Sequence, residues 1–219
     1  RDWLKACLGS LALTGVPGTS LKAAQSAAST VGPAWPIFRG DPALTGVGAS
    51  PLPAAPKLLW SFETESEPAS PVIQGDRVVV ATRDGDLISL DLATGKPTKP
   101  AVDIGFGFKG TGSIDPRGYP LLYAGQGLPD NSGRRGPWQL RVVDLIRNTQ
   151  SAAVYGNDPA AYRRAWGAFD SSALVHVGTD TLLEPGENGV YYRVALHSSF
   201  DAPARTVRVA PEVTRLVYR

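Results

Sequence analysis

The 219-residue chain contains no methionine, a single cysteine, Cys7, and only two histidines. One cysteine excludes an intrachain disulfide framework and a cysteine-rich zinc site, and two histidines argue against a histidine-rich metal centre. Lysine and arginine total 22 against 20 aspartates and glutamates, so the formal net charge is +2. A balance so close to neutral gives no electrostatic reason to expect a nucleic-acid partner. We therefore expect neither a metal ion nor a nucleic acid.

The sequence also lacks the short motifs of several common enzyme classes. It has no Walker-type phosphate loop, no Rossmann fingerprint and no Gly-x-Ser-x-Gly elbow around Ser171 or Ser172. The glycine-rich stretch GFGFKGTG leads towards a strand-like run, whereas a phosphate cradle opens a helix. We accordingly assign no catalytic residues.

Glycine and proline are abundant instead, with 24 and 19 residues. Hydrophobic residues make up 42% and charged residues 19%, and the mean hydropathy is −0.10. These values describe a folded globular chain, not a disordered one or a multi-span membrane protein. Because glycine and proline favour turns, the composition predicts an all-β fold of many short strands.

Residues 1–30 resemble the end of a secretory signal peptide. Arg1 and Lys5 precede a short apolar stretch, and Ser26 and Ala28 suit the small-residue cleavage positions. The alternative is a short N-terminal helix with a disordered tail. The signal-peptide interpretation predicts a protein outside the cytoplasm, periplasmic or secreted, with envelope association.

Residues 31–56 read as a Pro/Gly-rich strap, because repeated prolines prevent a regular helix. Within this strap, Trp35, Ile37 and Phe38 are the expected anchors on a core. The chain lacks an initiator methionine and stops at Arg219 inside a strand-like run, so we interpret it as a fragment.

The clearest pattern lies in residues 57–100, which hold four short apolar runs: KLLWSFETE, SPVIQ, RVVVATR and DLISLDL. Asp84 and Gly85 separate the last two runs. An Asp-Gly pair there favours a type I′ hairpin turn, in which both central residues have positive φ. Four antiparallel strands in about forty residues are the size of one β-propeller blade.

The pattern recurs in residues 101–160 and 161–200, and residues 201–219 read as the start of a further unit. Asp115-Pro116-Arg117-Gly118 supplies a turn in the second unit, and Asn188-Gly189 supplies one in the third. We predict a β-propeller arc of three to four four-stranded antiparallel blades in an incomplete ring.

Two segments, SPVIQGDRVVVATRDGDLISLDLATGK and FDSSALVHVGTDTLLEPGENGVYYRVAL, resemble the PQQ-like repeat β-propeller family, and WPIFRGDPALTGV looks like its N-terminal strap. The resemblance covers residues 35–219. It implies a ring of blades like that of the non-catalytic members, which include the outer-membrane assembly lipoprotein of the bacterial barrel-insertion machinery and uncharacterised exported propellers. The implied function is an exported binding or scaffold module whose loops recognise a protein or a small molecule.

The same resemblance leaves an alternative, part of a PQQ-dependent quinoprotein dehydrogenase with PQQ and calcium. Many such enzymes stack an adjacent cysteine pair on the cofactor, and here Cys7 is the only cysteine. Their blades also tend to carry a tryptophan soon after the Thr-Gly-Lys turn, but Pro97 and Thr98 follow Lys96. We therefore expect no cofactor outside this alternative.

The loop GLPDNSGRRGPW holds the strongest candidate for an interaction patch, formed by Arg134, Arg135 and Trp138. Arginine and tryptophan are enriched at interface hot spots. Asp130, Asn131 and Ser132 in the same loop offer oxygens to calcium, but six to eight ligands are not apparent. A solvated insertion loop is the third interpretation.

Other polar residues are interpreted as structural. Asp84 and Asp86 suit turn chemistry better than paired-carboxylate catalysis. Glu184 and Glu187 bracket a turn with no identifiable nucleophile nearby. His176 lies in the apolar alternation SALVHV, and His197 follows a strand end.

Overall fold

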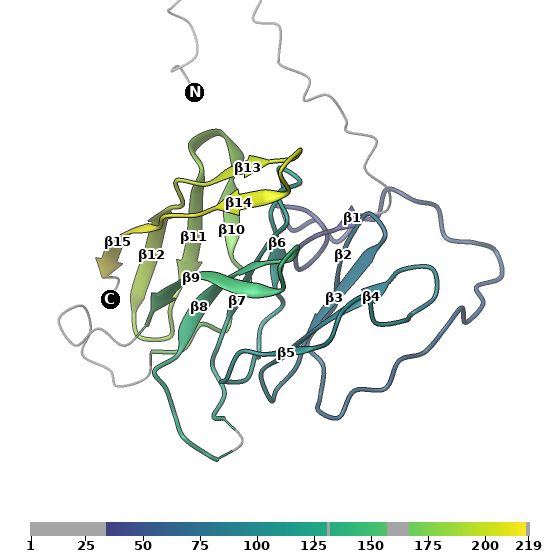
Figure 1. The fold of residues 1–219 in the computed structure, drawn as a ribbon, viewed down its shortest axis with the longest axis horizontal. Helices are drawn as coiled ribbons and strands as arrows, with labels where there is room; N and C mark the ends of the chain where they lie inside the picture. Colours follow the sequence, from purple (N-terminus) through teal and green to yellow (C-terminus); the bar gives the residue numbers. More distant parts are fainter. Residues whose placement is uncertain (1–33, 131, 157–166, 218–219) are drawn as a thin grey trace, which may run out of the picture. The chain divides into compact units, whose positions relative to one another are not determined.

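The computed structural model describes residues 34–130, 132–156 and 167–217 (Figure 1). In these ranges every element is a strand except one 3-10 turn, Val177–Thr179, so the predicted all-β class is confirmed. No helix in them is long and apolar enough to span a membrane. The predicted leader at 1–30, with Cys7, lies outside the described residues.

Three antiparallel sheets follow one another along the chain. The first contains β1 (Ala34–Trp35), β2 (Val72–Gln74), β3 (Arg77–Ala81), β4 (Asp86–Asp91) and β5 (Val102–Asp103). The second contains β6 (Ser113–Ile114), β7 (Leu121–Gly125), β8 (Gln139–Asp144) and β9 (Thr149–Tyr155). The third contains β10 (Leu174–His176), β11 (Thr181–Pro185), β12 (Val190–Ala195) and β15 (Glu212–Val217), and β13 (Ser199–Asp201) and β14 (Thr206–Arg208) form a separate hairpin.

The sheets pack face to face because successive side chains on a strand point to opposite faces. In the second sheet, Leu122 and Val143 pack with Val79 and Leu87 of the first sheet. Their neighbours on the opposite face, including Tyr123, pack with residues of the third sheet. Each meander is therefore one blade, and the described chain is a β-propeller-like stack of three blades.

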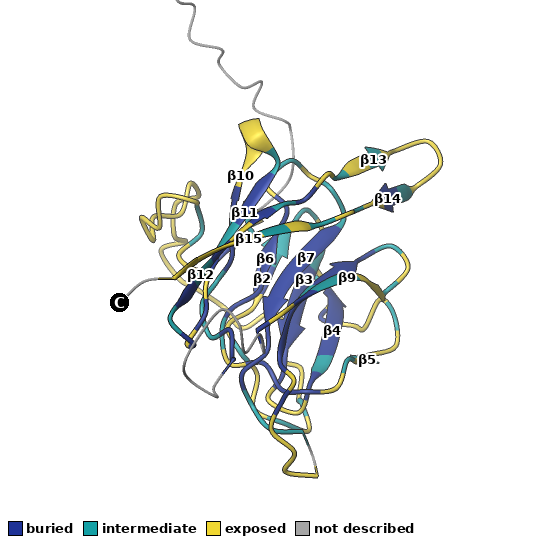
Figure 2. Cartoon of the chain, turned by 90° about the vertical axis from the view of Figure 1, so that its left-hand side faces the viewer, coloured by how far each residue is buried: buried dark blue, intermediate teal, exposed yellow. Residues whose placement is uncertain are grey.

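The burial pattern follows this stacking (Figure 2). Strands β3 and β7 are largely buried, whereas β15 is mostly exposed. The middle sheet has a neighbour on each face, and the two outer sheets each have one neighbouring sheet among the described residues.

Two strand predictions were wrong. Residues 57–65 were expected to form the first strand of a blade, but no strand lies there, and β5 is the fourth strand after β2–β4. Residues 212–217 were expected to belong to a further unit, but β15 pairs with β12 and completes the third sheet. Long-range pairing decided both cases, because strand propensity alone does not specify a partner.

The type I′ geometry predicted for the β3–β4 turn was also wrong. The Gly85 amide donates to the Thr82 carbonyl at 3.2 Å, and Gly85 has φ +100° while Asp84 has no positive φ. The Asp86 amide donates to the Thr82 hydroxyl at 3.1 Å. The Thr82 side chain thus supports a four-residue turn that needs positive φ only at its last residue.

A buried polar network joins the second and third blades. Asp115 is fully buried, accepts a hydrogen bond from the Tyr123 hydroxyl at 2.7 Å and pairs with the Arg117 guanidinium at 2.5 Å. Arg117 also pairs with Asp180. The hydrogen bond from Arg117 to Asp115 is the main cause that raises the pKa of Arg117. One guanidinium therefore bridges two carboxylates on different blades.

Replacing Arg117 by lysine should lower the free energy of unfolding by about 1–2 kcal/mol, because an ammonium lacks the planar fork that serves both carboxylates. Chemical denaturation would measure the change. Arg147→Lys is the control. The half-exposed Arg147 pairs with one carboxylate, Asp144, and donates to the Thr206 hydroxyl at 3.4 Å, so this variant should lose less than about 0.5 kcal/mol. Equal losses in the two variants would contradict the bridging role.

Candidate ligand pocket

The pocket lies where the chain enters the first strand of each blade. Ser70 precedes β2, Thr111 precedes β6, and Ser171 and Ser172 precede β10. Each is therefore at an equivalent place in its meander. Because the blades stack face to face, these three entry segments converge and present hydroxyl groups to one pocket.

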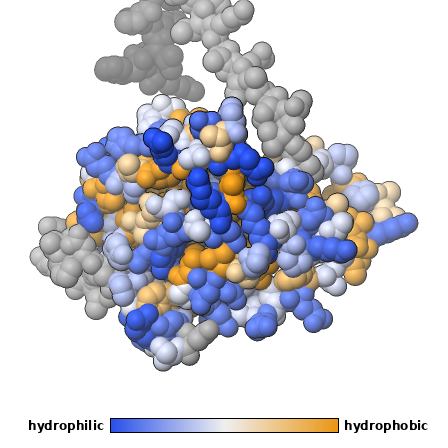
Figure 3. Space-filling model, in the orientation of Figure 1, coloured by the Kyte–Doolittle hydropathy of each residue, from blue (hydrophilic) through white to orange (hydrophobic). Residues whose placement is uncertain are grey.

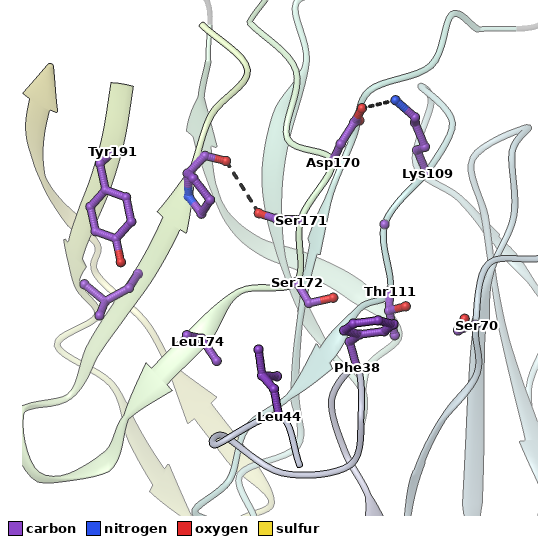
Figure 4. Close-up of a pocket in the computed structure, with 13 residues that line it drawn as sticks. Phe38, Leu44, Ser70, Lys109, Thr111, Asp170, Ser171, Ser172, Leu174 and Tyr191 are labelled. Atoms are coloured by element: carbon purple, nitrogen blue, oxygen red, sulfur yellow. Dashed lines mark hydrogen bonds and ion pairs between the residues drawn. The ribbon is translucent and has the colours of Figure 1, made fainter. Parts of the chain in front are cut away.

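The pocket encloses about 620 Å³, a volume within the usual range for small-molecule sites. Figure 4 shows Leu174 and Tyr191 on the side of the third sheet, Phe38 and Leu44 on the side of the strap, and Ser172 between them. The full set of lining residues is Phe38, Leu44, Ser70, Lys109, Gly110, Thr111, Asp170, Ser171, Ser172, Leu174, Leu183, Pro185 and Tyr191. Most of the wall is apolar, with a few convergent hydroxyls and one ion pair.

Lys109 and Asp170 form that ion pair, joining the second blade's entry segment to the third's. The Asp170 side chain is only 15% exposed. Glu187 lies 3.8 Å from the same ammonium. The hydrogen bond to Asp170 is the main cause that raises the pKa of Lys109. Lys109 is therefore held charged at the edge of the pocket.

Glu184 lies behind the pocket wall and is fully buried on β11. The Ser171 hydroxyl donates to its Oε1 at 2.5 Å, and Oε2 has no partner among the described residues. The pKa of Glu184 is raised to about 8, mainly by burial; the bond from Ser171 opposes the shift and the charge of Asp170 adds to it. Glu184 is therefore neutral at pH 7, so the wall behind Ser171 carries a carboxylic acid rather than a charge.

This arrangement suits binding better than nucleophilic catalysis. Neutral Glu184 is a poor general base for Ser171 at pH 7. The apolar walls can bury the body of a ligand, while the hydroxyls of Ser70, Thr111 and Ser172 can orient a polar end. These are the features of a small-molecule pocket with apolar walls and a few polar groups.

The structure does not bring Arg134, Arg135 and Trp138 into one surface patch. Trp138 is 2% exposed, packs with Phe106 and donates its indole hydrogen to the Leu128 carbonyl at 2.9 Å. Arg134 lies on the exposed loop with its guanidinium 5.0 Å from the centre of the Phe106 ring. The prediction that Trp138 lies at the surface was wrong, because its ring fills the core beneath this loop.

The oxygen-rich residues of that loop shape its backbone. Asp130 accepts from the Ser132 hydroxyl at 2.7 Å and from the Arg134 amide at 2.9 Å. The Ser132 bond is the main cause that lowers the pKa of Asp130. Asn131 lies outside the described residues. Across the described ranges, no three of the side chains His, Cys, Asp and Glu gather as a metal site.

The predicted turn residues lie between strands. Asp84 and Gly85 connect β3 to β4, and Asn188 and Gly189 connect β11 to β12. Gly189 has a positive φ of +81°. The Asn188 side chain is buried. The Asn188 amide donates to the Gly156 carbonyl at 2.8 Å, so this side chain also ties the turn to the neighbouring blade.

Sequence reasoning missed most of the pocket. It considered Glu184 but assigned it no role, and it did not single out Lys109, Asp170 or Tyr191. The signal that could have found it is positional, since Ser70, Thr111 and Ser172 each lie two residues before the first strand of a meander. Trp60 was also missed: its ring lies against Gly95 in the Thr-Gly-Lys turn and its indole donates to the Leu92 carbonyl at 2.9 Å.

Comparisons with known proteins give no family assignment. No protein-family model matches the chain, and no curated protein matches it. Among solved structures, BamB from Moraxella catarrhalis aligns with a TM-score of 0.41 and 16% identity, over 70% of this chain and 38% of that one. KlHsv2 with loop 6CD replaced by a Gly-Ser linker aligns with a TM-score of 0.42 and 12% identity, over 65% of this chain and 42% of that one. The chain thus spans about two fifths of the length of each.

Proposed function

We propose that this protein is an exported binding module whose recognition site is the pocket at the entry ends of the three blades. The ligand class we favour is a small molecule with an apolar body and one polar end. A propeller presents ligand-contacting residues on a rigid stack of sheets, so a site of this kind needs no moving part.

One observation carries the proposal: three successive blades contribute hydroxyl-bearing residues from equivalent positions to one largely apolar pocket. The Lys109–Asp170 ion pair fixes two of those entry segments to each other. Preorganised walls of this type reduce the entropy cost of binding. The proposal that the protein is exported rests on the sequence of residues 1–30.

No observation favours the quinoprotein dehydrogenase alternative. Calcium in proteins takes six to eight oxygen ligands, with carboxylates prominent among them. The described part of the chain holds no cluster of three candidate ligands among His, Cys, Asp and Glu. The pocket itself offers Asp170 as its one carboxylate, which is engaged by Lys109. We therefore assign no step to such a cofactor.

Filling the pocket should weaken the binding of a probe that matches it. We expect phenethyl alcohol, an aromatic body with a hydroxyl end, to bind the purified chain, and Ser172→Trp to weaken its binding at least about tenfold, which corresponds to about 1.4 kcal/mol. Saturation-transfer NMR with a titration would measure this.

Ser132→Trp is the matched control, because Ser132 lies on the exposed loop away from the pocket lining. It should bind the probe as the unmodified chain does. Equal binding by all three proteins would place the probe elsewhere and would contradict the proposed site.

A further inference from the structure

One wall of the candidate pocket comes from the strap and not from a blade. Residues 38–46 form this wall, and we call them the strap loop; they contribute Phe38 and Leu44 to the pocket lining. The chain just before them is fixed to the second blade, because the Ile114 amide donates to the Pro36 carbonyl at 2.7 Å. The strap loop therefore starts from an anchored point.

Hydrogen bonds inside the strap loop hold its shape. The Gly46 amide donates to the Arg39 carbonyl at 2.9 Å and closes the loop. Within it, the Asp41 carboxylate accepts from the Ala43 amide at 2.7 Å and from the Thr45 hydroxyl. The bond from Thr45 is the main cause that lowers the pKa of Asp41. The loop is thus closed on itself and offers a ligand a preorganised wall.

Leu44 has a backbone conformation that leucine rarely adopts. Its φ is +56°, in the left-handed region, where a bulky side chain is unfavourable and glycine or asparagine is preferred. Figure 4 shows its side chain pointing from the loop into the pocket, near Leu174. Strained residues of this kind concentrate at sites that contact ligands. The conformation of Leu44 therefore indicates that the pocket, and not the turn, requires a leucine here.

Exposure alone does not distinguish Leu44 from other apolar residues. It is 36% exposed, and hydrophobic residues reach the surface in scattered patches on the face drawn in Figure 3, as they do on most folded proteins. Among the described residues other than glycine, Leu44 alone combines a positive φ with a place in the pocket lining. This combination is the observation that carries the inference.

The strap loop and the blades line the pocket with different chemistry. Phe38 and Leu44 are both apolar, so the strap loop offers a ligand no side-chain hydrogen bond. The hydroxyl groups and the Lys109–Asp170 ion pair all come from the blades. The polar end of a ligand therefore belongs against the blades, and its apolar body belongs against the strap loop.

We propose that Leu44 determines the specificity of the pocket: its side chain closes the end formed by the strap loop and favours a ligand with a compact apolar body over one with a longer body. This inference rests on the proposed binding function, and it names the size class of the ligand. An apolar wall discriminates by size because added bulk must displace side chains that are held in place.

Two probes that share a hydroxyl end test this role. Phenethyl alcohol ends in a bare ring, whereas para-tert-butylphenethyl alcohol extends the same ring at its far end. The parent chain should prefer the shorter probe. Leu44→Gly should reduce that preference at least about fivefold, a factor typical of apolar walls that meet differences in bulk. Saturation-transfer NMR titrations would give both affinities.

Arg39→Gly is the matched control. Arg39 has φ +61° in the same loop but does not line the pocket, so glycine removes the same kind of backbone strain without opening the pocket. This variant should keep the preference of the parent chain, and so should Leu44→Met, which retains the apolar bulk. Both glycine variants should keep the melting temperature of the parent chain, because glycine accepts a positive φ.

The possible results separate this inference from the proposed function. An unchanged preference in Leu44→Gly, with probe binding intact, would overturn the role of Leu44 and leave the binding function standing. An equal change in Arg39→Gly would assign the effect to the loop backbone, and a melting temperature lowered in Leu44→Gly alone would assign the side chain to packing; either would also overturn it. A parent chain that binds neither probe would contradict the proposed function and this inference together.

Discussion

Replacing Glu184 by glutamine should remove most of the loss of stability that the chain undergoes between pH 5 and pH 8. The pKa of this buried carboxyl is about 8 in the folded protein, against an ordinary value of 4.5. The folded state therefore keeps a proton that the unfolded chain has already released in this range. Glutamine has the same shape and no proton to lose.

The direction in which stability changes with pH follows from proton binding. Because the folded state binds the proton more tightly, stability is fully present below pH 4.5 and falls as pH rises to about 8, above which the contribution is constant. One pKa unit corresponds to about 1.4 kcal/mol. Between pH 5 and pH 9 we expect the parent chain to lose about 4 kcal/mol relative to Glu184→Gln.

Denaturant unfolding at several pH values would measure this difference. Glu63→Gln is the control, because Glu63 is exposed and its substitution should leave the pH profile of the parent chain unchanged. Parallel pH profiles for the parent chain and Glu184→Gln would mean that Glu184 is ionised in the folded protein at neutral pH, which would contradict its raised pKa.

Gly85→Ala should destabilise the first blade by about 3–5 kcal/mol, combining a strained φ with overpacking. Gly85 has φ +100°, and a Cβ built on it would collide with the backbone carbonyl of Gly105. That carbonyl belongs to the segment after β5, which cannot move without breaking the bond from the Ile104 amide to the Gly85 carbonyl at 3.1 Å.

Gly75→Ala separates the cost of a positive φ from the cost of the collision with the Gly105 carbonyl. Gly75 has φ +62°, and a Cβ there would meet no atom within 4 Å. It should therefore cost only about 1 kcal/mol, the price of positive φ in an L residue. Thermal unfolding of both variants would measure the difference, and similar losses would show that the contact with Gly105 is unimportant.

The predicted blades illustrate what local pattern can establish. The runs RVVVATR and DLISLDL became β3 and β4 because alternate residues of each bury one face against the second sheet. KLLWSFETE has the same local character but no strand partner in the described residues. Its Trp60 packs on the outward side of the first sheet instead. Strand propensity was right wherever an adjacent hairpin supplied the partner.

Most of the candidate site could not be predicted from the sequence. Lys109 and Asp170 are 61 residues apart, and Ser171 and Glu184 come from different segments of one blade. Nothing in their local sequence marks them, because each acquires its environment only when blades stack. Trp138 illustrates the converse, since a residue typical of binding surfaces fills the core here.

By itself, the amino-acid sequence determined the all-β class and the succession of hairpins, because alternation and turn residues act over a few positions. Only the tertiary structure decided which strands pair at long range, which carboxyl is buried and neutral, and which residues line the pocket. Those properties depend on desolvation and contact between segments distant in the chain, and these arise only once one sheet covers another.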